Sequence, residues 1–131
     1  MKNVPNSKFG RLYREHITLI LNKDIDALLN QYAPDGLLIS SFEKTPKYFR
    51  GRDELRGHFD GILGIQGLET EIAFWAETEN PSTLMIVEAI TMQTSDGEAA
   101  MRFADSWVLN ERGEIQIHFA GMTQYPDGSV A

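Results

Sequence analysis

The feature that most constrains the fold is a run of four extended segments in the second half of the chain. They cover about residues 69–79, 84–94, 99–109 and 114–124, and the turn sequences Asn80-Pro81-Ser82, Ser95-Asp96-Gly97 and Glu111-Arg112-Gly113 separate them. Successive strands that are joined by tight turns pair antiparallel with their neighbours. The second half therefore predicts a four-stranded antiparallel meander.

The first half is mainly helical. Apolar residues recur at helical spacing from a cap at or near Ser7 to about Asn22, and a short second helix follows Asp24 and stops before Pro34. The sequence then predicts a turn at residues 33–36, a strand at 37–42, a brief strand at 48–50 and a third helix from about Arg52.

Helices followed by a long meander predict an α+β fold in which a curved antiparallel sheet packs its concave side on the helices. A chain of 131 residues is long enough for one real core, so we expect residues 1–131 to form a single domain. Such a cone-shaped arrangement leaves room for a cavity at one end.

Composition excludes several classes of function. The net charge of -7 repels phosphate backbones and anionic lipid surfaces, so neither nucleic acid nor a membrane is an expected partner. No run of apolar residues is long enough to cross a membrane, and no apolar signal core is present. The chain has no cysteine, which excludes thiol chemistry and permits a reducing compartment. We therefore expect a cytoplasmic protein.

Three segments in this order resemble the nuclear transport factor 2-like superfamily, in its SnoaL-like and ketosteroid-isomerase branch. They are LNKDIDALLNQYAPDGLLIS (21–40), FRGRDELRGHF (49–59) and RFADSWVLNERGEIQIHFAGM (102–122), and the resemblance covers nearly the whole chain. It implies the cone fold with three N-terminal helices. It says less about function, because the same fold is used by isomerases, cyclases, dehydratases, epoxide hydrolases and binding modules.

Asp105 is the first candidate for chemistry. It shares one strand face with Phe103 and Trp107, and aromatic neighbours raise the pKa of a carboxyl group by excluding water. The resemblance places it where steroid isomerases keep a protonated acid. The alternative is that Asp105 points outward or forms an ion pair with Arg102 or Arg56.

The three histidines of the chain all fall at positions that the pattern would bury. His16 and His58 lie on apolar helix stripes, and His118 lies in the last strand. By resemblance, His16 replaces a tyrosine that donates to an oxyanion, and His58 replaces a phenylalanine of the pocket. We expect at least two of them to line one cavity, where imidazole can move protons at neutral pH. His118 could pair with Asp105, which would then be ionised, and the sequence leaves both protonation states open.

The chain departs from the steroid isomerases at Ser40, which stands where they have the aspartate that shuttles the proton. A hydroxyl is too weak a base to abstract a carbon-bound proton, so steroid isomerisation by that route is not expected. A substitute base would be His58, His118 or Glu88, although Glu88 could equally face outward.

Other side chains are expected to bind substrate or to serve the core. The candidates for the cavity wall are Tyr13, Ser40, Phe59, Trp75, Glu88, Phe103, Trp107 and Met122. A basic cluster could steer an anionic substrate or simply be solvated; it comprises Lys44, Lys47, Arg50, Arg52 and Arg56. No close His-x-x-x-His or Glu-x-x-His pair exists, so a metal is not expected. No other cofactor is expected either.

The last strand has a second apolar face. If His118 points inward, the alternation places Ile115, Ile117 and Phe119 outward, where another surface must cover them. This arrangement predicts a homodimer through the outer face of the sheet.

The leading hypothesis is therefore a cofactor-independent enzyme that performs proton transfer on a small apolar carbonyl or hydroxy compound, as an isomerase, cyclase or dehydratase. Asp105 and His16 would stabilise charge on oxygen, and His118 or His58 would be the base. The alternative is a binding or dimerisation module without chemistry. Epoxide hydrolysis would need an aspartate-arginine-aspartate set, of which Arg102 and Asp105 supply only a part.

Overall fold

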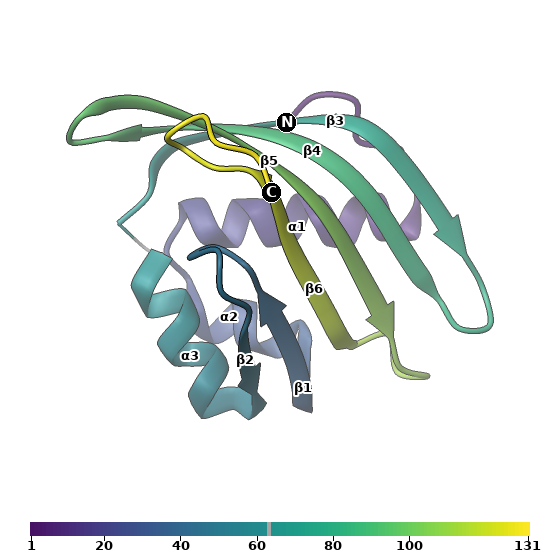
Figure 1. Ribbon diagram of the computed structural model, residues 1–131. Helices are drawn as coiled ribbons and strands as arrows, with labels where there is room; N and C mark the ends of the chain where they lie inside the picture. Colours follow the sequence, from purple (N-terminus) through teal and green to yellow (C-terminus); the bar gives the residue numbers. More distant parts are fainter. Residues whose placement is uncertain (63) are drawn as a thin grey trace.

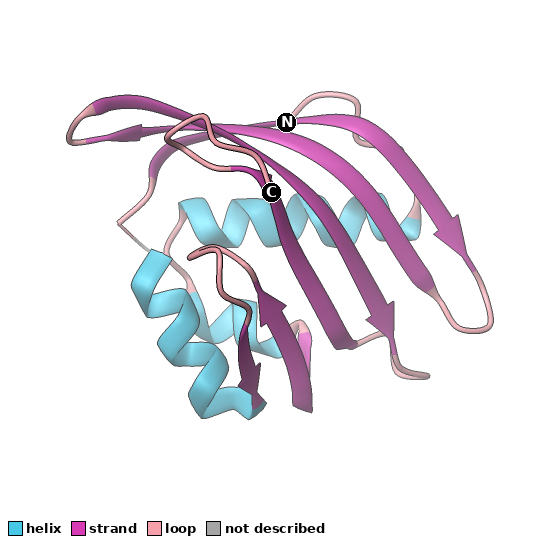
Figure 2. Cartoon of the chain, viewed as in Figure 1, coloured by secondary structure: helices cyan, strands magenta, loops and turns pink. Residues whose placement is uncertain are grey.

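The computed structural model describes every residue of the chain except Leu63. Within the described residues, three helices and six strands follow one another in an order that agrees with the predicted pattern (Figures 1 and 2). Their bounds are α1 Lys8–Leu21, α2 Ile25–Asn30, β1 Tyr32–Ser40, β2 Lys47–Arg50, α3 Gly51–Ile62, β3 Gln66–Thr78, β4 Thr83–Thr94, β5 Gly97–Leu109 and β6 Ile115–Gln124.

The strands form one curved sheet in the order β2-β1-β6-β5-β4-β3. Strands β3 to β6 pair antiparallel with their neighbours, so the predicted meander is confirmed, while β1 pairs parallel with β6. The three helices lie on one side of the sheet, where α1 runs beneath its concave face and α3 lies beside β1 and β2 (Figure 1). The α+β class and the cone-like packing predicted from the sequence are thus confirmed.

The first two helices begin at polar caps. The Ser7 Oγ accepts a hydrogen bond of 3.0 Å from the Gly10 N–H, and Asp24 Oδ1 accepts one of 3.2 Å from the Ala27 N–H. Each cap satisfies a donor that the first turn of a helix leaves without a partner. These two contacts fix where α1 and α2 start, and hence which residues of α1 face the sheet.

The predicted turn at residues 33–36 is wrong, because these residues belong to β1. The pairing of β1 with β6 shifts from Tyr32 opposite Ile115 to Leu37 opposite Ile117, which makes an irregular bulge between the two positions. Pro34 has no N–H to give to a ladder, so an interrupted stretch of strand accommodates it. The turn-like composition therefore marks a break in the pairing and not an end of the strand.

The expected outward position of Ile115 is also wrong. Ile115 is fully buried, whereas Ile117 and Phe119 are 40% and 43% exposed on the outer face. The register between β5 and β6 shifts between Val108 and Leu109, and this irregularity moves Ile115 to the inner side. A shift of one residue in a strand reverses the face on which a side chain lies.

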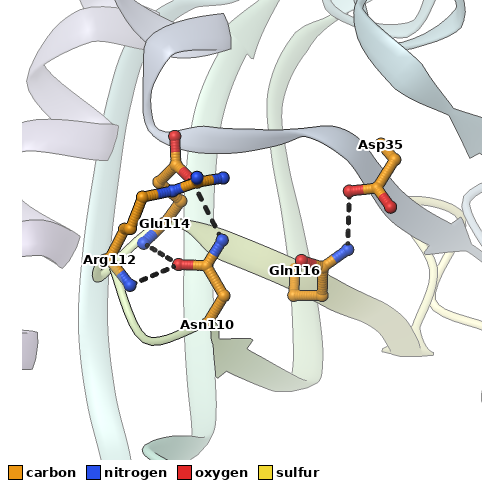
Figure 3. A network of polar contacts seen from close by, with 5 residues as sticks. All are labelled: Asp35, Asn110, Arg112, Glu114 and Gln116. Carbon is orange, nitrogen blue, oxygen red and sulfur yellow. Dashed lines mark hydrogen bonds and ion pairs between the residues drawn. The ribbon is translucent and has the colours of Figure 1, made fainter.

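A polar network closes the β5–β6 turn (Figure 3). Asn110 Oδ1 accepts hydrogen bonds from the backbone N–H groups of Arg112 and Glu114, and Asn110 Nδ2 donates to Glu114 Oε1. Next to it, Gln116 Nε2 donates to Asp35 Oδ1 on β1. These bonds hold β6 in register with both of its neighbours, which positions the inward-facing residues of β6.

The core lies between the helices and the concave face of the sheet. Its largest fully buried side chains are Trp107, Tyr13, Tyr32, Phe59, Leu28, Leu38, Leu55, Leu84 and Ile115. None of the helices within the described residues combines the length and apolar character needed to cross a bilayer.

Candidate active site

A cavity of about 310 Å³ lies between α1, α3 and the concave face of the sheet. Ten of the residues that the sequence singled out line it: Tyr13, His16, His58, Phe59, Glu88, Phe103, Asp105, Trp107, His118 and Met122. Most of the polar lining residues come from three neighbouring cross-strand rows, in which inward residues of adjacent strands lie side by side. These rows contain the pairs Trp107 and His118, Asp105 and Ala120, and Glu88 and Phe103.

The cavity has a closed end and an open end. Trp107 and His118, which are 1% and 5% exposed, lie at the closed end, while Thr94 and Pro126 are exposed at the other. On β5 the distance from Asp105 to Ala99, near the open end, is roughly 20 Å at the usual rise per residue. The apolar walls therefore lie between the open end and the polar groups at the closed end.

Asp105 is a buried acid of this end, in the row of the sheet next to Trp107 and His118. Burial raises the pKa of its carboxyl group from 3.8 to about 7, and a hydrogen bond from the Glu88 carboxyl offsets a part of that rise. A carboxyl group that titrates near neutrality is present in both forms at physiological pH. It can therefore accept a proton and return it.

Glu88 holds its proton more firmly than Asp105. Burial and the nearby Asp105 charge raise the pKa of Glu88 well above its usual value. The Tyr13 hydroxyl donates a hydrogen bond to Glu88 Oε2, and burial followed by the Glu88 charge raises the pKa of Tyr13 in turn. Within this chain of three groups, Asp105 is the one that loses its proton first.

His118 lies beside Asp105 in a neutral state. Its Nε2 is 3.8 Å from Asp105 Oδ2, and its Nδ1 is 2.8 Å from the Tyr32 hydroxyl. Burial lowers the pKa of His118 to about 3. The bond to His118 Nδ1 is the only side-chain hydrogen bond of the Tyr32 hydroxyl within the described residues, so the hydroxyl is assigned as the donor. Nδ1 is then the acceptor, and the ring proton of the neutral imidazole is assigned to Nε2. His118 therefore presents an N–H donor toward Asp105 and the cavity.

His16 has the opposite tautomer. Its Nδ1 is 2.9 Å from Gln31 Oε1, an oxygen that can only accept, so the ring proton is assigned to Nδ1 and Nε2 carries a lone pair. Burial, with the nearby His118, lowers the pKa of His16 to about 3. The rings of His16 and His118 are 5.9 Å apart between centroids. One acceptor and one donor thus lie close together at the closed end.

His58 is half-buried and lies in an aromatic cluster with Phe42, Phe49 and Phe59, whose ring centroids are 5.5, 4.9 and 5.2 Å from its own. Burial, with the nearby His118, lowers the pKa of His58 to about 4. It is neutral at physiological pH and lies in the side wall of the cavity toward α3.

Three polar atoms of the lining side chains are buried without a hydrogen-bond partner in the described part of the chain. They are Asp105 Oδ1, Trp107 Nε1 and His118 Nε2. An unpaired buried polar atom costs about 1–3 kcal/mol, so its retention usually has a functional reason. Their gathering at one end of an apolar cavity makes this end the candidate active site.

The family model of the SnoaL-like domain matches residues 13–118, which is most of the chain and contains the residues described above. The protein belongs to the SnoaL-like family. The predicted resemblance to this branch of the nuclear transport factor 2-like superfamily is therefore confirmed. A search of the curated proteins finds no match.

Solved structures show the same fold for this SnoaL-like domain. The epoxide hydrolase/cyclase-like enzyme SalBIII of pyran ring formation in salinomycin is 13% identical, with a TM-score of 0.70 over 86% of this chain and 88% of that one. Rv0760c from Mycobacterium tuberculosis, solved with estradiol-17beta-hemisuccinate, is 14% identical, with a TM-score of 0.68 over 82% and 88%.

A third similar structure is an NTF2-like protein of unknown function from Exiguobacterium sp. 255-15. It is 16% identical, with a TM-score of 0.67 over 84% of this chain and 96% of that one. At such identities the three likenesses establish the fold of the SnoaL-like domain and not its reaction.

Two residues predicted for the cavity wall of the SnoaL-like domain lie elsewhere. Ser40 is buried in the row of Asp105, but its Oγ accepts a hydrogen bond of 3.4 Å from the Phe42 N–H, and it lines a second cavity instead. Trp75 is not among the residues that line the cavity; its ring packs against Tyr13, and its Nε1 donates to Glu77 Oε2 at the surface.

The basic cluster of the domain is engaged at the surface, and none of its residues lines the main cavity. Lys44 pairs with Asp127, Lys47 with Glu43 and Arg56 with Asp26, and the Arg50 and Arg52 guanidinium groups donate to the Asp35 carbonyl oxygen and the Asn30 side chain. Of the two interpretations of this cluster, the solvated one fits the structure.

Sequence reasoning missed two residues that set the site. Gln31 and Tyr32 determine the tautomers of His16 and His118, yet neither is among the candidate site residues predicted from the sequence. A buried tyrosine and glutamine at the end of an apolar helix were the available signal, since buried polar groups need partners.

Among the described residues, no three potential metal ligands gather into a metal-binding geometry.

Proposed function

We propose that this SnoaL-like domain is a small-molecule enzyme that transfers protons on an apolar carbonyl or hydroxy compound, as an isomerase, cyclase or dehydratase. The observation that carries the proposal is the position of Asp105, whose carboxyl group has a pKa of about 7, at the closed end of an apolar cavity beside a neutral imidazole. A general acid-base group works best when its pKa is near the working pH.

In the proposed reaction, ionised Asp105 removes a proton from the substrate and later returns it. Glu88 keeps its own proton and donates a hydrogen bond to Asp105, so Asp105 carries the negative charge of this pair. The apolar walls exclude water, which preserves the basicity of the carboxylate and strengthens the hydrogen bonds of the site.

The histidines bind and polarise oxygen in this scheme. His118 donates its Nε2–H to the substrate carbonyl, where charge develops as the proton leaves, and His16 Nε2 accepts from a substrate hydroxyl. Neither ring is assigned the role of base, because pKa values of about 3 make both imidazoles weak proton acceptors. The same reasoning removes the base role from His58, whose pKa is about 4.

Two other reactions fit the site less well. The aspartate route of steroid isomerases lacks its base, because Ser40 has replaced that residue and lies outside the main cavity. Epoxide hydrolysis by an aspartate-arginine-aspartate set lacks its arginine, because Arg102 is exposed on the opposite face of β5. The kinship of fold with SalBIII therefore supports the use of the cavity and not that chemistry.

The test is proton exchange at carbon. 2-Tetralone is incubated with the protein in deuterated buffer, and NMR follows the loss of its α-protons. We expect the protein to accelerate exchange, and Asp105→Asn to reduce the acceleration by about 100-fold or more, as losses of a general base usually do. If 2-tetralone binds in the cavity without faster exchange, the domain is a binding module, which was the alternative from the sequence.

We also propose that the domain forms a homodimer through the outer face of its sheet. Phe74, Met85, Ile117 and Phe119 are each at least 40% exposed there, and the strand register joins them into one apolar surface. Apolar surfaces of this kind are usually covered by a partner. The cytoplasmic location expected from the sequence also stays a proposal.

A further inference from the structure

A second cavity of about 210 Å³ lies between α3 and the segment that joins β1 to β2. Polar groups from Ser40, Thr45 and Lys47 line one side of it. On the side of α3, Gly57 and Gly61 leave room, since a Cβ added at either position meets no atom within 4 Å. The cavity is thus bounded by a smooth stretch of helix and a polar loop.

The second cavity shares a wall with the first. Phe42, His58 and Ile62 line both. The Phe42 ring lies 5.3 Å from the Phe103 ring and 5.5 Å from the His58 ring, measured between centroids. Because Phe103 is two residues from Asp105, the wall lies about 7 Å along β5 from the proposed proton-transfer group. A substituent of moderate length on a ligand bound at Asp105 reaches this wall.

The polar groups around the second cavity favour an uncharged oxygen function. Lys47 is paired with Glu43, so the two charges compensate each other. Ser40 Oγ accepts from the Phe42 N–H, and its hydroxyl hydrogen has no acceptor among the described residues. Among the described residues, the His58 side chain also has no hydrogen-bond partner. As a neutral imidazole it offers one donor and one acceptor.

We propose that the second cavity is a subsite for an oxygen-bearing substituent, such as a hydroxyl or ether chain, of the ligand whose body fills the main cavity. His58 and Ser40 bind this substituent, which crosses the shared wall between Phe42 and His58. The ligand is accordingly an elongated compound with two separated oxygen functions. The inference rests on the proposed function only for the position of the reactive end at Asp105.

The test compares two fluorescent probes. 2-Naphthol has an apolar body with one hydroxyl, and 6-(2-hydroxyethoxy)-2-naphthol adds an oxygen-bearing chain at the far end of the same body. Affinities are measured for the wild-type protein and for Gly61→Leu, which places a side chain in the second cavity. Gly57→Leu places a side chain in the same cavity from the neighbouring turn of α3. This second variant is included in case the leucine at position 61 points into solvent. Asp60→Leu is the matched control, because Asp60 is exposed on α3 and lines neither cavity.

We expect the wild type and Asp60→Leu to bind the chain-bearing probe about tenfold more tightly than 2-naphthol, since its chain adds buried contacts and hydrogen bonds. At least one of the two glycine variants should lose this gain while its affinity for 2-naphthol changes by less than about twofold. Replacement of glycine by leucine favours the helix, so these variants should fold.

Three results would overturn the subsite: equal affinity of both probes for the wild type, no binding of either probe, or a gain that survives in both glycine variants. Failure of the proposed function gives a different result. In that case the protein does not accelerate 2-tetralone exchange, but the hydroxyethoxy chain of the probe still increases affinity and the glycine variants still lose that increase.

Discussion

At the scale of single residues, burial decides what each ionisable side chain of this domain can do. Desolvation favours the neutral form, so it raises the pKa of Asp105 and lowers the pKa of His16 and His118. The pKa of Asp105 thereby lies in the range that is usual for an exposed histidine. His16 and His118 stay neutral and act only as hydrogen-bonding groups. The assignment of acid-base chemistry to residue types by their ordinary pKa values therefore fails in this cavity.

The raised pKa of Asp105 predicts a stability change that depends on pH. The unfolded chain releases this proton near pH 3.8 and the folded protein near pH 7, so ionisation opposes folding increasingly across that range. Asp105→Asn avoids the cost. Relative to the wild type it should gain nothing at pH 4 and on the order of 2–4 kcal/mol in unfolding free energy at pH 8. Urea unfolding at both pH values measures this, and an equal difference at the two would contradict the raised pKa.

Tyr32→Phe should separate positioning from folding. Without the hydroxyl, His118 Nδ1 loses its partner, and the ring proton is free to move to Nδ1, which removes the donor from the cavity side. We expect about 10- to 100-fold slower 2-tetralone exchange, as for other residues that orient a functional imidazole. The affinity for 2-naphthol should change less than the rate. Exchange at the wild-type rate would show that the tautomer of His118 does not matter.

At the scale of elements, the sequence predicted what local chemistry determines. The caps at Ser7 and Asp24, the apolar stripe of α1 and the turns of the meander all depend on neighbours within a few residues. The errors arose where pairing between distant strands decides, as in the bulge that keeps Pro34 within β1 and the shift that buries Ile115. No periodicity within one segment reports such shifts.

Asn110→Ala should weaken the β5–β6 turn. The Asn110 side chain makes three hydrogen bonds in the network of Figure 3. Its loss should reduce the unfolding free energy by about 1–3 kcal/mol, because the partly buried Glu114 N–H and the exposed Arg112 N–H both lose their acceptor. Arg112→Ala, which removes an exposed pair with Glu114, should cost less than about 1 kcal/mol. Thermal unfolding of both variants tests the order, and equal effects would contradict this account of the turn.

At the scale of the whole molecule, the sheet has two apolar faces with different uses. The concave face surrounds the cavity, and the convex face presents the surface around Phe74, Met85, Ile117 and Phe119. The sequence predicted the fold and most of the cavity wall, since both follow from alternation along strands. It did not predict the positions of Ser40 and Trp75, which depend on a hydrogen bond within the β1–β2 segment and on packing against α1.

Phe119→Glu tests the use of the convex face. Sedimentation velocity at micromolar concentration should show a dimer for the wild type and a monomer for the variant, because burial of an unpaired charge in the interface is costly. The cavity faces the other side of the sheet, so the affinity for 2-naphthol should persist. A wild type that sediments only as a monomer would refute the dimer and leave the site unaffected.

The central claim is that one carboxyl group at the closed end of the cavity titrates near neutrality. The most direct measurement is carbon NMR of the aspartate side-chain carboxyl groups in selectively labelled protein, followed from pH 3 to pH 9, with Asp105→Asn to assign the signal. The Asp105 resonance should titrate with a pKa of about 7. A titration near pH 4, as for an exposed aspartate, would contradict it.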